Sequence, residues 1–116
     1  MKSEKSLPEN FISWEDSVDR VGGEEEFLIE LLNDLKEMID ENLKKIQSYI
    51  HEKKYHEIRE LAHSIKGASG NLGLNTVYDT TLNLENNAKE ENLEKINKYF
   101  KNLEQDYRHL SILLDN

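Results

Sequence analysis

The sequence contains no cysteine, a single proline and no long apolar run. Without cysteine, neither a disulfide framework nor a thiolate zinc site can form. No apolar stretch approaches the roughly 20 residues that a helix needs to cross a bilayer. The opening residues, MKSEKSLPENF, lack the apolar segment of a secretory signal. We therefore expect a cytoplasmic protein of one domain with no part inserted in a membrane.

Positive charge is also scarce in this chain. The 15 Lys and Arg residues are outnumbered by 24 Asp and Glu residues, which gives a net charge of −9. Nucleic-acid binding requires a basic surface, so we expect no nucleic-acid partner. The segment from Lys53 to Lys66 departs from this balance, because it holds four basic residues and two acidic ones.

No segment shows the two-residue alternation of a strand, and from Glu24 onward apolar residues recur with the 3.6-residue period of amphipathic helices. This pattern predicts one helix from Glu24 to about residue 50 and a second from about Tyr55 to Asn71. A third is expected to open at Thr76, which forms a capping-box pattern with Asp79. The N-cap residue Asn92 is expected to open the last.

A shorter helix is expected from Phe11 to Arg20, with Trp14 holding it against the others. Residues 1–10 are polar, and we expect them to be disordered. The predicted fold is therefore all-α: an antiparallel four-helix up-and-down bundle with a short extra N-terminal helix, spanning residues 11–116. One bundle uses the apolar surface well, which favours a monomer.

The stretch AHSIKGASGNLG, residues 62–73, places a histidine beside glycines within a predicted helix. A glycine inside a helix costs about 1 kcal/mol relative to alanine. When the helix is projected at about 100° per residue, its apolar stripe centres about 40° from Leu61, whereas His63 lies at about 200°. The outward side also carries Arg59, Lys66, Gly67 and Gly70.

An exposed imidazole in such a setting has a chemical use. Neutral imidazole is a nucleophile near neutral pH. Gly67 and Gly70 would clear space for another macromolecule to approach His63 closely. Lys66 and Arg59 could stabilise an anionic group, such as a phosphoryl, carried on the ring. We predict that Arg59, Gly67 and Gly70 contact the partner.

The histidines also allow other interpretations. A single exposed histidine is often inert, and His51, His56 and His109 are expected to be solvated surface residues. Glu60 and His63 have the Glu-x-x-His spacing of di-iron bundles, but such sites need a second motif and inward-facing side chains. The sequence also lacks a Walker pattern. We therefore expect neither a metal site nor an ATP site.

The same stretch resembles the signature of histidine-containing phosphotransfer (HPt) domains, which reads Ala-His-x-Leu-Lys-Gly followed by small residues and Leu-Gly. Ile65 stands in place of the usual leucine, a substitution that conserves volume. Leu84-Glu85 resembles the Leu-Glu of the next helix in the family. The resemblance extends over about Trp14 to Leu114.

The resemblance implies that His63 accepts the phosphoryl group on Nε2, that Lys66 assists beside the phosphoryl group and that Gly67 provides clearance. Family members are phosphocarriers without an ATP site, which take the group from a receiver-domain aspartate and pass it to another receiver. A hybrid sensor histidine kinase and response regulators are the implied partners. No cofactor is implied on this chain, since Mg²⁺ belongs to the receiver.

Two alternatives stay open from the sequence. The chain could be the related phosphoacceptor domain of a chemotaxis-type histidine kinase, which takes its phosphoryl group from a kinase domain. It could also be a helical adaptor whose histidine is never phosphorylated.

Overall fold

The computed structural model describes residues 7–115, which form five α-helices and no strand. The all-α class predicted from the periodicity is therefore confirmed. None of the helices in this part of the chain combines the length and apolar character needed to cross a bilayer. The helices are α1 (Trp14–Arg20), α2 (Glu25–Glu52), α3 (Tyr55–Asn71), α4 (Asn75–Lys89) and α5 (Leu93–Leu114).

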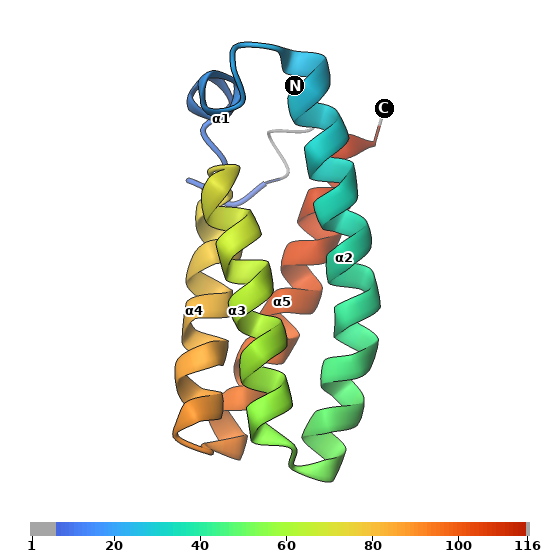
Figure 1. The fold of residues 1–116 in the computed structure, drawn as a ribbon, viewed down its shortest axis with the longest axis vertical. Helices are drawn as coiled ribbons and strands as arrows, with labels where there is room; N and C mark the ends of the chain where they lie inside the picture. Colours follow the sequence, from blue (N-terminus) through green and yellow to red (C-terminus); the bar gives the residue numbers. More distant parts are fainter. Residues whose placement is uncertain (1–6, 116) are drawn as a thin grey trace.

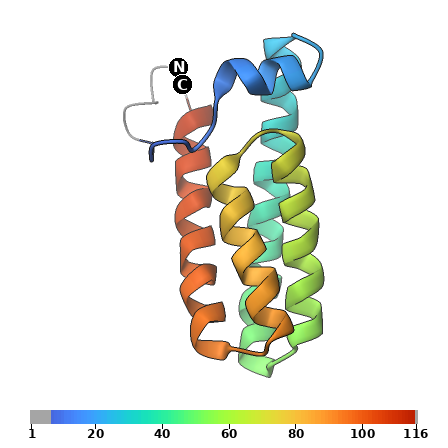
Figure 2. The ribbon, with the colours of Figure 1, turned by 90° about the vertical axis from the view of Figure 1, so that its left-hand side faces the viewer.

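The four longer helices lie along the main axis of a molecule that measures 41 × 25 × 21 Å (Figure 1). Contacts join α2 to α3, α3 to α4, α4 to α5, and α5 back to α2. The α2–α3 and α4–α5 connections lie at one end, and the α3–α4 connection lies at the other (Figure 1). At that second end, α1 lies across the tops of the longer helices (Figure 2).

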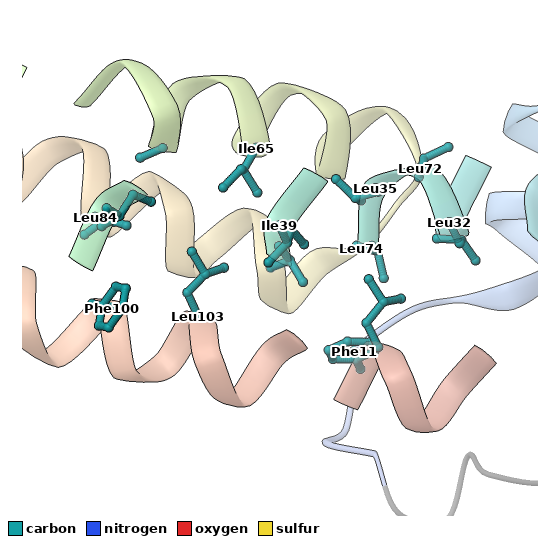
Figure 3. Packing of buried hydrophobic residues seen from close by; sticks show 14 of the residues in the cluster. Phe11, Leu32, Leu35, Ile39, Ile65, Leu72, Leu74, Leu84, Phe100 and Leu103 are labelled. Carbon is teal, nitrogen blue, oxygen red and sulfur yellow. The ribbon is translucent and has the colours of Figure 1, made fainter. Parts of the chain in front are cut away.

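The core is filled mainly by leucine and isoleucine from all four long helices. Figure 3 shows Ile39, Ile65, Leu84 and Leu103 pointing into this shared interior, and each is fully buried. Burying such a side chain contributes about 1.5–3 kcal/mol. The amphipathic pattern of each helix therefore fixes which side faces inward, and the opposite side of α3 is left for solvent.

Each tight turn between the long helices contains one residue in the left-handed conformation: Lys53 (φ 56°), Gly73 (φ 72°) and Glu91 (φ 56°). In each turn the next amide donates to a carbonyl five residues back, as Leu74 does to Ser69 at 2.9 Å. This bond closes the end of a helix. A Cβ at position 73 would lie 2.7 Å from Oγ of Ser17, so glycine is required there by contact with α1 as well as by backbone conformation.

The short helix α1 begins at Trp14, so the predicted start at Phe11 is wrong. Phe11 lies in the core instead, with 1 % of its surface exposed. The indole Nε1 of Trp14 donates to Glu25 at 2.7 Å, which holds α1 against α2 as expected. Arg20 donates from its guanidinium to the carbonyl oxygen of Gly70 at 2.9 Å, which ties α1 to α3.

The helices α4 and α5 begin in different ways. The side chain of Asn92 accepts from the amide of Lys95, so it caps α5 as predicted. The predicted capping box at Thr76 is wrong, because α4 already begins at Asn75 and has no side-chain cap. The preceding residue, Leu74, is fully buried, so core packing sets this helix start. The disorder expected for residues 1–10 falls partly on residues 1–6, outside the described range, and Leu7 packs against the core.

One carboxyl group is buried at the contact of α5 with α4. Asp106 is only 4 % exposed, and its Oδ2 has no hydrogen-bond partner among the described residues. Burial raises the pKa of Asp106 from its ordinary 3.8 to about 6, and a hydrogen bond from Thr80 offsets only part of this rise. The folded protein therefore holds this proton more tightly than the unfolded chain does.

Replacing this carboxyl group should stabilise the protein at neutral pH. The stability that depends on a protonated Asp106 is complete below pH 3.8 and is lost as the pH rises through about 6. Asp106→Asn should therefore raise the free energy of unfolding by about 2 kcal/mol at pH 7 and by much less at pH 4. Urea unfolding at both pH values measures this, with Asp79→Asn on the exposed side of α4 as control. An equal gain at both pH values would contradict the assignment.

Candidate functional site

His63 lies in the middle of α3, and 67 % of its side chain is exposed. Its neighbours Ala62 and Ile65 are fully buried and fix the rotation of the helix. The outward direction predicted for His63 from the helical projection is therefore confirmed. The imidazole is held on a rigid element and is open to solvent.

The ring of His63 is anchored by a glutamate from the neighbouring helix. Nδ1 of His63 lies 2.8 Å from Oε2 of Glu85 on α4. The other carboxylate oxygen, Oε1, lies 2.7 Å from Nζ of Lys66. The Glu85 side chain is only 14 % exposed, so one nearly buried carboxylate joins both α3 residues.

The protonation state of Glu85 decides which ring nitrogen of His63 carries hydrogen. Burial alone would raise the pKa of Glu85, but hydrogen bonds from Lys66 and His63 outweigh burial and lower it. The carboxylate is therefore ionised at neutral pH and can only accept. Nδ1 must then carry the hydrogen that it donates, which leaves the lone pair of the neutral ring on Nε2.

Lys66 does not extend into solvent as the projection implied. Its side chain is 19 % exposed and is turned toward α4 by the ion pair with Glu85. The projection places a residue by its Cα and cannot foresee that a long side chain will reach sideways to a neighbouring helix. The sequence pattern contains Glu85 only as part of a Leu-Glu pair and predicts no role for it.

The two glycines that follow His63 differ in their surroundings. A Cβ added at Gly67 would meet nothing within 4 Å, so the surface there is open as predicted. A Cβ at Gly70 would lie 3.2 Å from Cδ2 of Tyr78. The clearance expected at Gly70 is thus wrong, because the ring of Tyr78 already occupies the space, and its predicted contact with a partner stays a prediction.

An apolar groove lies beside Gly67, between α2 and α3. Its apolar lining consists of Leu31, Leu35, Met38, Ala68 and Leu72, with Asp34 and Asn71 at its border. Ala68 of this groove directly follows Gly67 in α3, and the apolar side chains of the groove are buried or partly buried.

The Hpt domain family matches residues 30–111, a range that includes His63, Lys66, Gly67 and Glu85. The chain belongs to the Hpt domain family. No curated protein and no solved structure matched it. Hpt domains are phosphocarrier modules for histidine phosphotransfer in two-component systems, where they interact with receiver domains and kinases.

The remaining histidines of this Hpt domain lie in different surroundings. His56 and Arg59 border the same open concavity as His63, and His56 Nε2 lies 3.5 Å from Glu60 Oε1. His109 was expected to be a solvated surface residue, and this prediction is wrong. Its ring packs edge-on against Phe11 at a centroid distance of 5.9 Å, and its Nδ1 is buried.

The bond from Glu85 should fix the tautomer of His63. In the wild-type protein, nitrogen NMR of the neutral ring should show hydrogen on Nδ1. Glu85→Gln removes the charged acceptor and should increase the population with hydrogen on Nε2. Glu60→Gln, a change at an exposed position of α3, the helix that carries His63, should leave the tautomer unchanged. An identical tautomer population in all three proteins would show that Glu85 does not orient the ring.

The two glycines should respond differently to alanine. Gly67→Ala should raise the free energy of unfolding by about 1 kcal/mol, because alanine favours the helix and its Cβ meets nothing. Gly70→Ala should raise the free energy of unfolding by less, because the ring of Tyr78 must move to make room for the added Cβ. Chemical denaturation measures both changes, and in a Tyr78→Ala background the two gains should become alike. A gain at Gly70 that is already equal to that at Gly67 would refute the packing explanation.

Proposed function

We propose that this Hpt domain is a phosphorelay intermediate that accepts a phosphoryl group on Nε2 of His63. The donor is the phosphorylated aspartate of one receiver domain, and the acceptor is the aspartate of another. The observation that supports this most directly is the 2.8 Å bond between Nδ1 and Glu85, which leaves the Nε2 lone pair free on a largely exposed ring.

The transfer step needs a nucleophile and a stabilised ring. The Nε2 lone pair attacks phosphorus, the bond between phosphorus and the aspartyl oxygen breaks, and its electron pair leaves with the receiver carboxylate. The ring keeps its Nδ1 hydrogen and gains positive charge, which the adjacent Glu85 carboxylate stabilises. In the onward step a receiver carboxylate attacks phosphorus, and the electron pair of the nitrogen–phosphorus bond returns to Nε2.

The other site residues have supporting roles in this proposal. Lys66 assists at the phosphoryl group and also holds Glu85 against α3. Gly67 admits the receiver surface, and the apolar groove beside it supplies contact area. The helices α2 to α5 form the antiparallel up-and-down bundle that presents these groups on one rigid face.

The proposal extends to the setting of the domain. It has no cofactor or ATP site of its own, and the receiver supplies Mg²⁺. It acts as a monomer in the cytoplasm, takes the phosphoryl group from a hybrid sensor histidine kinase and delivers it to a response regulator. The acidic balance of the chain, with a net charge of −9, supports protein rather than nucleic-acid partners.

A transfer assay tests the proposal. The protein is mixed with phosphorylated receiver domains, and acid-labile, alkali-stable label on it is measured. The wild-type protein should be labelled, and His63→Gln should carry no label while its unfolding free energy stays within about 0.5 kcal/mol, since the side chain faces solvent. His56→Gln, one exposed histidine two turns away on α3, should be labelled normally.

The alternatives give different outcomes. Labelling by an isolated kinase domain but by no receiver would favour the phosphoacceptor domain of a chemotaxis-type kinase. No label from either source would favour a non-phosphorylated helical adaptor. Label that persists in His63→Gln would move the phosphoacceptor to another residue.

A further inference from the structure

An open concavity lies beside His63 on the exposed side of α3. It is lined by His56, Arg59, Glu60, His63, Ser64 and Glu85. All but Glu85 come from α3, within about two helical turns. Long side chains on a helix lean toward its N-terminus, so the ring of His63 leans toward the turn that carries Arg59 and Glu60.

The bond to Glu85 determines which ring nitrogen of His63 is left free. Nδ1 is engaged by Glu85 at 2.8 Å, and Nε2 lies on the opposite side of the ring. A group attached to Nε2 is therefore directed away from Glu85. Residues four apart on a helix are surface neighbours, so the Arg59 side chain is within reach of such a group.

The positive charges near His63 are not equally available. The ammonium of Lys66 lies 2.7 Å from Glu85, so its charge is already offset by a nearly buried carboxylate. His56 lies beside Glu60 at 3.5 Å. Arg59 is exposed, and none of the ion pairs found within residues 7–115 includes it. Arg59 is thus the cation of the concavity that keeps its charge for a ligand.

We propose that Arg59 binds the phosphoryl group carried on Nε2 of His63. This inference rests on the proposed function, because it assumes that His63 is the phosphoacceptor. A guanidinium is permanently charged and can donate two parallel hydrogen bonds to phosphoryl oxygens. Glu85 holds the ring, Lys66 holds Glu85, and Arg59, unpaired within residues 7–115, adds its positive charge to the assistance that Lys66 gives at the phosphoryl group.

Glu60 supplies an internal counterpart for the test. It lines the same concavity with a negative charge, so it should act on a phosphoryl group in the opposite direction to Arg59. A residue that merely docks a protein partner would have no effect on a phosphoryl group in the absence of that partner. A partner-free measurement therefore separates phosphoryl binding from the docking role predicted for Arg59.

Phosphoramidate provides such a measurement, because it phosphorylates histidine without a receiver or a kinase. The Nε2 lone pair attacks phosphorus, the phosphorus–nitrogen bond of the reagent breaks, and ammonia leaves. The phosphoryl group then loses its last proton near pH 6. Phosphorus NMR from about pH 5.5 to about pH 8.5 follows that ionisation directly on the intact protein.

The expected result is a pair of opposite shifts. Arg59→Gln should raise the pKa of the phosphoryl group by about 0.5, because the dianion loses a neighbouring positive charge at an exposed site. Glu60→Gln should lower that pKa. Arg108→Gln, which removes an exposed arginine from α5, is the matched control and should leave the pKa unchanged.

The outcomes separate this inference from the proposed function. If wild-type His63 is phosphorylated and Arg59→Gln gives the same phosphoryl pKa as Arg108→Gln, the assignment of Arg59 is overturned while the phosphoacceptor stands. If phosphorus appears on another residue, or His63→Gln is labelled as well as wild type, the proposed function itself fails. A phosphoryl pKa that rises in Arg59→Gln and stays unchanged in Arg108→Gln supports the inference.

Discussion

The carboxylate of Glu85 is the contact on which the rest of the site depends. It bonds a ring nitrogen of His63 and the ammonium of Lys66, so it determines the tautomer of one and the direction of the other. Its low exposure strengthens both interactions, because the surrounding protein screens charge less than water does. The ring nitrogen that keeps a free lone pair is consequently defined by packing between α3 and α4, although His63 itself is largely exposed.

Asp106 is a more deeply buried carboxyl group than Glu85, and its pKa shifts in the opposite direction. Glu85 has two donors and its pKa is lowered, whereas Asp106 has only Thr80 and its pKa is raised. Both groups lose hydration, so the difference comes from the number and charge of their partners. The site carboxylate is therefore charged where its charge is used, and the distant one lowers stability at neutral pH.

The features that follow from local pattern could be predicted from the sequence. The 3.6-residue period predicts the helices and the outward direction of His63, and the open surface at Gly67 follows from the same projection. The bond between His63 and Glu85 could not be predicted, because no periodicity specifies how α3 and α4 are aligned along their axes. For the same reason the sequence could not predict that the ring of Tyr78 lies against Gly70 or that the Lys66 side chain turns toward α4, since each depends on a contact between helices.

The three turn residues in the left-handed conformation differ in the substitutions that they can accept. At Lys53 and Glu91 the structure already holds residues with side chains in that conformation, so these two corners do not require glycine. At Gly73 the space is taken by Ser17 of α1, which lies 56 residues earlier in the chain. A substitution at this corner therefore needs a change at Ser17 in addition to accepting the strain of a left-handed side chain, so the residues at positions 17 and 73 are expected to change together.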